Sequence, residues 1–362
     1  MKKEFILIVL VLLVFSLSGQ NVKTDPTLAQ IEKCNTNLDK ANLLYNIYTD
    51  LENDFPDSAI TYANQANKIY QILSKSKDDQ ISQQANKRIA YINHNLGRYH
   101  ISKGAFDKAL VNLSVSLPVF IKNRDSAKIA ACYNNYGVVY ESMGEYSKAI
   151  NYYHQSLDIE EGENNTLGIA TCYLNIGVVY YYQSDFSKAI NYYENALELY
   201  ETLGEQEYMT FCYVNIGILY DEQSKYELSY DYFQKALAVA RKLQDKYVEG
   251  YCYSNMGSSY KKQKKYETSI AYYNKSLEVR RTIGDKQGEA VVIDNIANLN
   301  LIIAQSIDKP EIAKHHYSIA LKYSKEALLM GQNIGLLPLQ KTAYLNISEA
   351  YKGLKKYKKN AK

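Results

Sequence analysis

Apolar, polar and small residues recur along this chain with a period of 40 residues. Asparagine marks the period six times, and glycine follows each asparagine at plus two, except in the last copy, where alanine stands. The asparagines are Asn95, Asn135, Asn175, Asn215, Asn255 and Asn295, and the small residues are Gly97, Gly137, Gly177, Gly217, Gly257 and Ala297. Self-similarity of this length indicates a repeat protein, in which each copy packs on its neighbours.

Each repeat predicts two helices joined by a short turn. In one copy, residues 130–140 place apolar and aromatic side chains at helical spacing, and residues 146–157 do so again. Gly144 lies between the two segments, where a helix C-terminus favours glycine. Proline is scarce, with 5 in 362 residues, which disfavours a sandwich or barrel of short strands. The pattern therefore predicts an all-α protein.

The register within one repeat resembles that of the tetratricopeptide repeat family. It is carried by Tyr133, Tyr136, Gly137, Tyr140, Gly144, Tyr146, Ala149, Tyr153, Ser156 and Leu157, although Tyr replaces the usual Trp and the closing Pro is absent. The 40-residue period resembles the longer variant of the family, with extended helices. The resemblance implies a right-handed superhelical solenoid of antiparallel helix pairs, with about seven repeats and a final unpaired helix.

The repeats divide the chain from residue 38 to residue 362. A divergent first repeat covers about 38–73, and five strong repeats cover about 90–122, 130–162, 170–202, 210–242 and 250–282. A seventh, about 290–332, carries extra residues near 306–316 that we expect to bulge from the turn between its helices. An eighth is a half repeat at 340–358, with one helix followed by a predicted turn at residues 355–359.

Residues 1–19 have the pattern of a secretory signal peptide. Lys2 and Lys3 precede an apolar run from Phe5 to Leu17, and small residues follow where a signal peptidase would cut. The run is shorter than the roughly 20 residues that span a bilayer as a helix. We therefore expect a cleaved signal, export to the periplasm or beyond, and a linker at 20–37. The alternative is an uncleaved N-terminal anchor.

On a helical wheel, the repeated asparagine points away from the side of the first helix that packs on the second. In the resembled family that face lines a concave groove, where an amide can donate to and accept from the backbone of an extended peptide. The candidate ligand-binding residues are Asn95, Asn135, Asn175, Asn215, Asn255 and Asn295, with Tyr91, Val178, Tyr182, Phe211, Ile218 and Tyr251 as an apolar lining. The alternative is that each amide only bridges to the next repeat and sets the stacking angle.

Two charged pairs stand on the same side of consecutive repeats. Asp221 and Glu222 precede Lys261 and Lys262 by 40 residues. The four side chains are predicted to pair across the lip of the groove. Alternatively, the two lysines bind a carboxylate of the ligand.

The remaining chemistry-bearing residues favour structural roles. Cys132, Cys172, Cys212 and Cys252 stand one per repeat, too far apart for disulfides, and no Cys-x-x-Cys spacing indicates a metal site. Cys34 is the one candidate reactive thiol. No phosphate loop or nucleophile elbow is present, so we expect neither enzymatic activity nor a cofactor. A formal charge of +3 disfavours a nucleic-acid partner.

These features predict a non-catalytic scaffold outside the cytoplasm that holds a peptide or protein segment in its groove. One alternative is the sensory part of a signalling receptor, with a membrane or output partner at the C-terminal end, because similar arrays precede such parts in bacterial sensors. A further alternative is an envelope assembly scaffold that uses its convex face.

Overall fold

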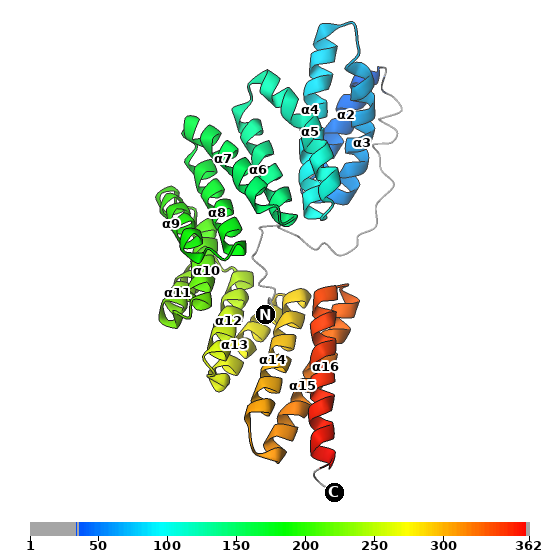
Figure 1. The fold of residues 1–362 in the computed structure, drawn as a ribbon. Coiled ribbons are helices and arrows are strands. Elements are labelled where there is room, and N and C mark those ends of the chain that lie inside the picture. Colours follow the sequence, from blue (N-terminus) through cyan, green and yellow to red (C-terminus); the bar gives the residue numbers. More distant parts are fainter. Residues whose placement is uncertain (1–33, 35, 360–362) are drawn as a thin grey trace. The chain divides into compact units, whose positions relative to one another are not determined.

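A computed structural model describes residue 34 and residues 36–359, and its regular elements there are α-helices (Figure 1). The chain divides into two compact units, an N-terminal unit at 1–199 and a C-terminal unit at 200–362. The N-terminal unit contains α2 (Asn37–Leu51), α3 (Pro56–Leu73), α4 (Asp79–Ser102), α5 (Phe106–Asn123), α6 (Ser126–Ser142), α7 (Tyr146–Gly162), α8 (Thr166–Tyr182) and most of α9 (Phe186–Leu203). The C-terminal unit contains the end of α9 and then α10 (Gln206–Glu222), α11 (Tyr226–Lys242), α12 (Lys246–Lys262), α13 (Tyr266–Thr282), α14 (Lys286–Ser306), α15 (Pro310–Asn333) and α16 (Leu337–Lys359).

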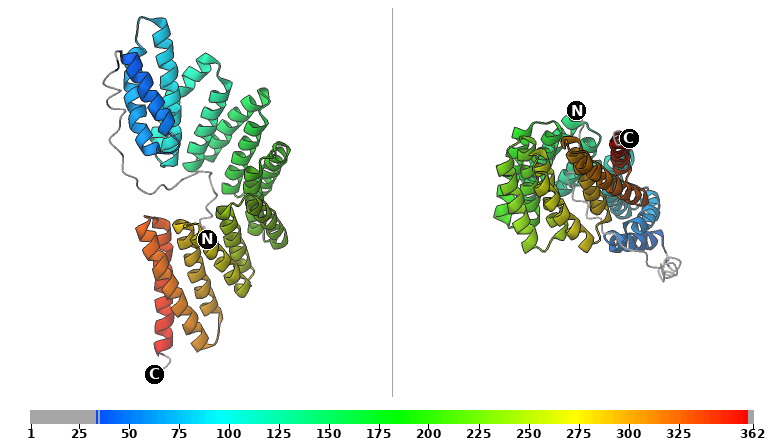
Figure 2. Two further views of the ribbon diagram at one scale, coloured as in Figure 1. Left: turned by 180° about the vertical axis from the view of Figure 1, so that it is seen from behind. Right: turned by 90° about the horizontal axis from the view of Figure 1, so that it is seen from below.

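Consecutive helices pack as antiparallel pairs, one pair per repeat (Figures 1 and 2). The pairs are α2/α3, α4/α5 and α6/α7 in the N-terminal unit, and α10/α11, α12/α13 and α14/α15 in the C-terminal unit. First helices of neighbouring pairs also contact one another, α4 with α6, α6 with α8, α10 with α12, and α12 with α14. Within each unit, the first helices therefore form a continuous layer.

Left-handed residues make the turns within the pairs short. The second residue after the end of the first helix is Gly104, Gly144, Ser184, Ser224 or Lys264, with φ between 59° and 77°. A residue in this conformation turns the chain back and lets the following N–H groups bond the last carbonyls of the helix. The next first helix then begins at a capping side chain, because Asp125, Asn165, Asp245 and Asp285 each accept from the N–H three residues on.

The repeated glycine allows a second-helix ring to lie against the backbone of the first helix. A Cβ atom at Gly177, Gly217 or Gly257 would stand 2.7 to 2.8 Å from the rings of Tyr193, Phe233 and Tyr273, respectively. Those rings are buried, so each repeat gains the burial of a large aromatic side chain, typically about 1.5–3 kcal/mol. The small residue of each repeat therefore lets the paired helices approach closely.

The extra residues of the seventh repeat do not bulge, and that expectation is wrong. Helix α14 continues to Ser306 and α15 begins at Pro310, so residues 306–316 extend both helices and leave three residues for the turn. Proline at the start of α15 is compatible with the helix, because the first turn needs no N–H partner there. Apolar contacts continue along the extension, where Leu301 and Ala304 pack with Ala313 and Tyr317.

The predicted turn at residues 355–359 is also wrong, because α16 remains helical through Lys359. Lysine is a good helix former, and Leu354 packs against the cluster around Ala350. The predicted signal peptide and most of the predicted linker lie outside the described residues. None of the described helices combines the length and the apolar character needed to cross a bilayer.

Replacing Gly177 with alanine should lower the free energy of unfolding by about 1–3 kcal/mol, because the new methyl group overlaps the Tyr193 ring. The matched control is Gly162→Ala at the end of α7, where a Cβ meets nothing within 4 Å. That change should be neutral or stabilising. Urea denaturation followed by circular dichroism measures both variants. Equal midpoints for the two would contradict the ring contact.

Candidate functional site

In the N-terminal unit, the repeated asparagine ties each first helix to the one before it. The Asn175 Nδ2 atom donates to Asn134 Oδ1 at 2.7 Å, joining α8 to α6. The Asn135 Nδ2 atom lies 3.2 Å from His94 Nε2, joining α6 to α4. The acceptor in each case is the residue just before the preceding copy of the repeated asparagine. These contacts are the structural bridges that the sequence offered as an alternative to ligand binding.

The bridging continues from α4 to α2 through a buried polar network. The Asn95 Nδ2 atom donates to the Tyr48 hydroxyl at 2.7 Å and to Glu52 Oε2 at 2.9 Å, and Asn95 Oδ1 lies 3.2 Å from His94 Nδ1. A neutral His94 with its proton on Nδ1 donates to Asn95 and accepts from Asn135, which satisfies every contact. Burial lowers the pKa of His94 to about 4, so the neutral form is the one present near pH 7.

On α10, α12 and α14 of the C-terminal unit, the repeated asparagine is not used for bridging in this way. The Asn255 Nδ2 atom donates within its own helix, to the Tyr251 carbonyl at 3.0 Å. Among the described residues, no side-chain hydrogen bond engages Asn215 or Asn295, and both are half-buried. The accepting position before Asn255 holds Val214, which has no polar side-chain atom. The amides of Asn215, Asn255 and Asn295 thus keep hydrogen-bonding capacity that Asn95, Asn135 and Asn175 have already used.

Helix α16 carries a further copy of the asparagine that the sequence analysis missed. The Asn346 Nδ2 atom donates to Asp294 Oδ1 at 2.9 Å, the same bridge to the preceding first helix. The lengthening of α14 and α15 moves it out of the 40-residue step. Burial raises the pKa of Asp294, while the side chains of Thr342 and Asn346 and the charge of Lys261 act in the opposite direction. A search that allowed for the insertion would have found this residue.

The predicted apolar lining is only partly accessible. Val178 and Ile218 are almost completely buried in the helix layer, so the expectation of an open surface there is wrong. Tyr91, Phe211 and Tyr251 are half-buried. Tyr182 is 38% exposed, and its ring stacks on Tyr146 with the centroids 5.9 Å apart. Contact of these side chains with a ligand stays a prediction.

The charged pairs join across neighbouring first helices, as one of the two interpretations predicted. The Lys262 ammonium lies 2.7 Å from Asp221 Oδ2 and 2.9 Å from Glu222 Oε1. Burial opposes the charge on Lys262, but the two carboxylates outweigh it and raise the pKa of the lysine. This ion pair links α12 to α10. Lys261 lies in the field of Asp294 instead, so neither lysine stands as an isolated cation.

Glu141 is a buried carboxyl group at the end of α6. Its charge acts on Tyr182, which lies at the end of α8 in the next repeat. Glu141 accepts a hydrogen bond from the Tyr153 hydroxyl at 2.8 Å. Burial raises the pKa of Glu141 to about 7, and the hydrogen bond from Tyr153 reduces the shift only in part. The charged form is therefore costly in the folded chain.

The cysteines have the character of buried apolar side chains. Cys132, Cys172, Cys212 and Cys252 are free thiols in the core. Burial raises the pKa of Cys132 and Cys172 to about 11, which keeps them protonated and unreactive. Cys34 is half-buried. In the described part of the chain, no three His, Cys, Asp or Glu side chains gather where a metal ion could sit.

A tyrosine clamp recurs in four repeats. We use this name for two first-helix tyrosines, seven residues apart, with a second-helix tyrosine ring between them. The central ring lies 6.0 to 6.2 Å from the first tyrosine and 5.3 to 5.5 Å from the second. The triplets are Tyr133/Tyr152/Tyr140, Tyr173/Tyr192/Tyr180, Tyr213/Tyr232/Tyr220 and Tyr253/Tyr272/Tyr260.

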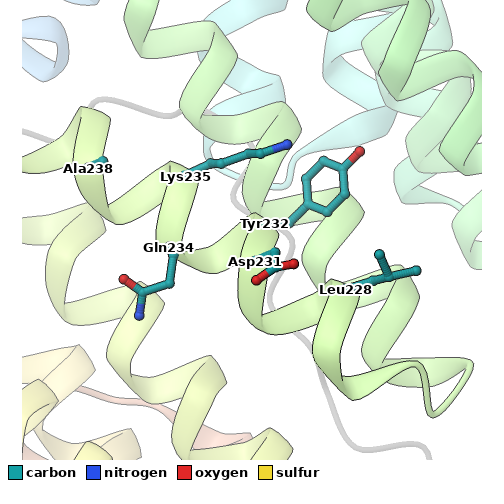
Figure 3. Close-up of a pocket in the computed structure, with 6 residues that line it drawn as sticks. All are labelled: Leu228, Asp231, Tyr232, Gln234, Lys235 and Ala238. Atoms are coloured by element: carbon teal, nitrogen blue, oxygen red, sulfur yellow. The ribbon is translucent and has the colours of Figure 1, made fainter.

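The clamp on α11 borders an open surface hollow (Figure 3). Tyr232, the central ring, and Lys235 project from the helix there, and the Lys235 ammonium lies 4.6 Å from the Tyr232 ring centroid. Gln234 points the other way in Figure 3. A lysine therefore covers the ring that an incoming cation would otherwise meet.

Replacing Asn175 with alanine should destabilise the chain by about 0.5–1.5 kcal/mol, because it removes the bridge to Asn134. Asn255→Ala is the matched control, since that amide bonds only its own helix, and its midpoint should move much less. Chemical denaturation of both variants decides the comparison. A larger loss in Asn255→Ala would contradict the difference between the two units.

Glu141→Gln should stabilise the chain at pH 8 and have little effect at pH 4.5. The folded-state pKa lies above the unfolded value, so the carboxyl lowers stability progressively between about pH 4.5 and 7, by roughly 3 kcal/mol at most. Glutamine stays neutral and can still accept from Tyr153. Melting temperatures of both proteins across this range test the effect. The titration of His94 changes the stability of both proteins equally, so it drops out of the difference between their melting temperatures. A difference independent of pH would contradict the assignment.

Comparison with known proteins agrees with this fold. A family model described as tetratricopeptide repeat matches residues 88–162, 168–242 and 208–282. No curated protein matches the sequence. The crystal structure of aspartyl phosphate phosphatase F from Bacillus subtilis is similar, with 14% identity, a TM-score of 0.58, and coverage of 93% of this chain and 96% of that one.

Two further solved structures are similar over most of the chain. A Rap protein complexed with competence and sporulation factor has 13% identity and a TM-score of 0.54, covering 88% of this chain and 99% of that one. A signal transduction ATPase with a tetratricopeptide repeat sensor, from Pyrococcus horikoshii, has 18% identity and a TM-score of 0.55, covering 90% of this chain and 56% of that one. At these identities the similarity concerns the fold. The matched repeats and the helix pairs show that the chain belongs to the tetratricopeptide repeat family.

Proposed function

We propose that this chain is a non-catalytic scaffold that binds an extended peptide segment of another protein on the first helices of its C-terminal unit. The observation that carries the proposal is the set of amides on α10, α12 and α14 that do not bridge to a neighbouring helix. Each has an apolar residue one turn earlier on the same helix, Phe211, Tyr251 or Val291. The three helices contact one another in order.

The spacing of these amides suits an extended backbone. Packed helices lie about 8–10 Å apart. An extended chain advances about 3.3 Å per residue, so one amide would meet every third residue of a peptide that crosses the helices. An asparagine amide both donates and accepts, which matches a peptide group without selecting a side chain. The half-buried rings of Phe211 and Tyr251 would contact the side chains between these points.

The N-terminal unit has a different part in this proposal. Its amides at Asn95, Asn135 and Asn175 are held by neighbouring helices, so they would give stiffness more than affinity. Tyr91 and Tyr182 would supply contacts by their rings. The Rap protein complexed with competence and sporulation factor supports the choice of a protein or peptide ligand, because a similar fold serves that binding there.

We further propose that the chain works outside the cytoplasm after loss of residues 1–19, on the strength of the signal pattern. N-terminal sequencing of the protein from a fractionated envelope tests this, and an intact Met1 in the cytoplasmic fraction would refute it. A second candidate is the sensory part of a larger receptor, with a membrane or output partner. The repeat sensor of the Pyrococcus horikoshii ATPase favours it, and the size of the native protein on a blot distinguishes the two.

The double variant Asn255→Ala with Asn295→Ala should weaken peptide binding about tenfold or more, because each lost hydrogen bond contributes about 1 kcal/mol. Phage-displayed random peptides selected on the full chain provide the ligands, and calorimetry gives their affinities. Asn135→Ala is the control, since its amide already bonds His94, and it should keep the affinity. Equal losses in the control and the double variant would place the ligand elsewhere.

A further inference from the structure

Helix α16 packs through one side only. Leu339, Ala343, Asn346 and Ala350 are buried, and the helix contacts α14 and α15. On another side, Tyr344 is 55% exposed and Tyr351 is 50% exposed. These two tyrosines are seven residues apart, which is two helical turns, so they lie on the same side of the helix about 10 Å apart along its axis.

The contacts of α16 identify which part of a repeat these tyrosines represent. The Tyr344 hydroxyl accepts from Gln332, twelve residues earlier, at 3.4 Å. In an earlier repeat, the Tyr253 hydroxyl accepts from Arg241, also twelve residues earlier, at 2.6 Å. The bridge from Asn346 to Asp294 matches the same register. Tyr344 and Tyr351 therefore correspond to Tyr253 and Tyr260, the two outer rings of a tyrosine clamp.

In the four complete clamps, the position between these rings is filled by a second-helix tyrosine of the same repeat. Among the side chains that the structure describes, no ring occupies the corresponding position on α16, although the Lys325 ammonium lies 5.4 Å from the centroid of the Tyr351 ring. The exposed side of α16 carries the same pair of rings that forms an interface in the complete clamps. The complete clamps therefore show what kind of side chain fits between Tyr344 and Tyr351. The required occupant is a helix that runs antiparallel to α16 and presents a tyrosine.

We propose that the open clamp at Tyr344 and Tyr351 binds an amphipathic helix of a partner protein, with a tyrosine inserted between the two rings. Each stacked or tilted tyrosine pair of this geometry strengthens binding by roughly two- to tenfold beyond the effect of the area that it buries. This site lies at the last helix and uses none of the amides of the proposed peptide-binding face. The inference stands independently of that proposed function.

Two features of α16 restrict the sequence of the partner helix. Lys352, Lys355 and Lys356 are exposed at the C-terminal end of α16, where an antiparallel helix would begin, and Lys352 also pairs with Glu349 at 2.7 Å. Acidic residues in the first turn of the partner complement these cations and the helix dipole. The second helices α11 and α13 have such a residue, Glu227 and Glu267.

The second restriction concerns the residue after the partner's tyrosine. In a complete clamp this residue is Tyr273, whose ring lies so close to Gly257 that a Cβ there would stand 2.7 Å away. Ser348 occupies the position of that glycine on α16. The residue after the clamp tyrosine must therefore be smaller than tyrosine, and leucine meets this requirement. The open clamp selects a Tyr-Leu helix over a Tyr-Tyr helix.

A fluorescein-labelled peptide with the α13 sequence, residues 266–282 and Tyr273→Leu, tests the proposal by fluorescence anisotropy against the full chain. We expect saturable binding that Tyr344→Ala or Tyr351→Ala weakens about tenfold, the effect of losing one half of the clamp. Tyr230→Ala, an exposed tyrosine on α11, should leave the affinity unchanged. The unmodified α13 peptide and a Tyr272→Ala version of the probe should both bind more weakly.

Three results would overturn the proposal. They are the absence of saturable binding, binding that survives both Tyr344→Ala and Tyr351→Ala, and a dimer in sedimentation that Tyr351→Ala dissociates. The last would mean that a second copy of the chain covers this face. Both tyrosines are half exposed, so the variants should keep the melting temperature of the parent chain, which verifies that they fold.

Discussion

The contact between a second-helix ring and the backbone of the first helix is the constraint on which the other features of the fold depend. Glycine at positions such as Gly177 and Gly257 removes the one side chain that would keep the helices apart, and Tyr193 and Tyr273 fill the space completely. The close approach sets the distance within each pair. It also places the next first helix against the last one, so that a layer of first helices forms.

That layer must satisfy its polar side chains, and the two units do so differently. In the N-terminal unit, the accepting position holds His94 or Asn134, so the repeated asparagine of the next helix is bound and half-buried. In the C-terminal unit, the position before Asn255 holds valine, and that amide turns to its own backbone. A valine at the accepting position therefore leaves Asn255 without the bridge that Asn135 and Asn175 make.

The tyrosines form a second contact between paired helices, and this contact reaches the surface. Tyrosine buries a large apolar ring while its hydroxyl remains free to meet water or a polar neighbour. Four repeats use this property to join their two helices with a second, half-exposed ring beside the buried one. The same pair of rings on α16 has no central ring among the described residues, and it is correspondingly more exposed. The pair of rings that joins the two helices of a complete repeat is thus an exposed aromatic surface on α16.

The sequence alone determined the helix pairs, their period and the buried role of the cysteines, because each follows from a spacing that recurs unchanged along the chain. It also offered pairing of Asp221 and Glu222 with the lysines 40 residues on as one of two interpretations, and Lys262 does pair with both carboxylates. The tertiary structure decided what the sequence left open. The bridge of Asn175 requires a polar partner 41 positions earlier, and the burial of Val178 depends on the neighbouring helices. The structure of the seventh repeat and the role of Asn346 were not predicted from the 40-residue period. The extra residues of that repeat lengthen two helices, which shifts the sequence register but preserves the packing.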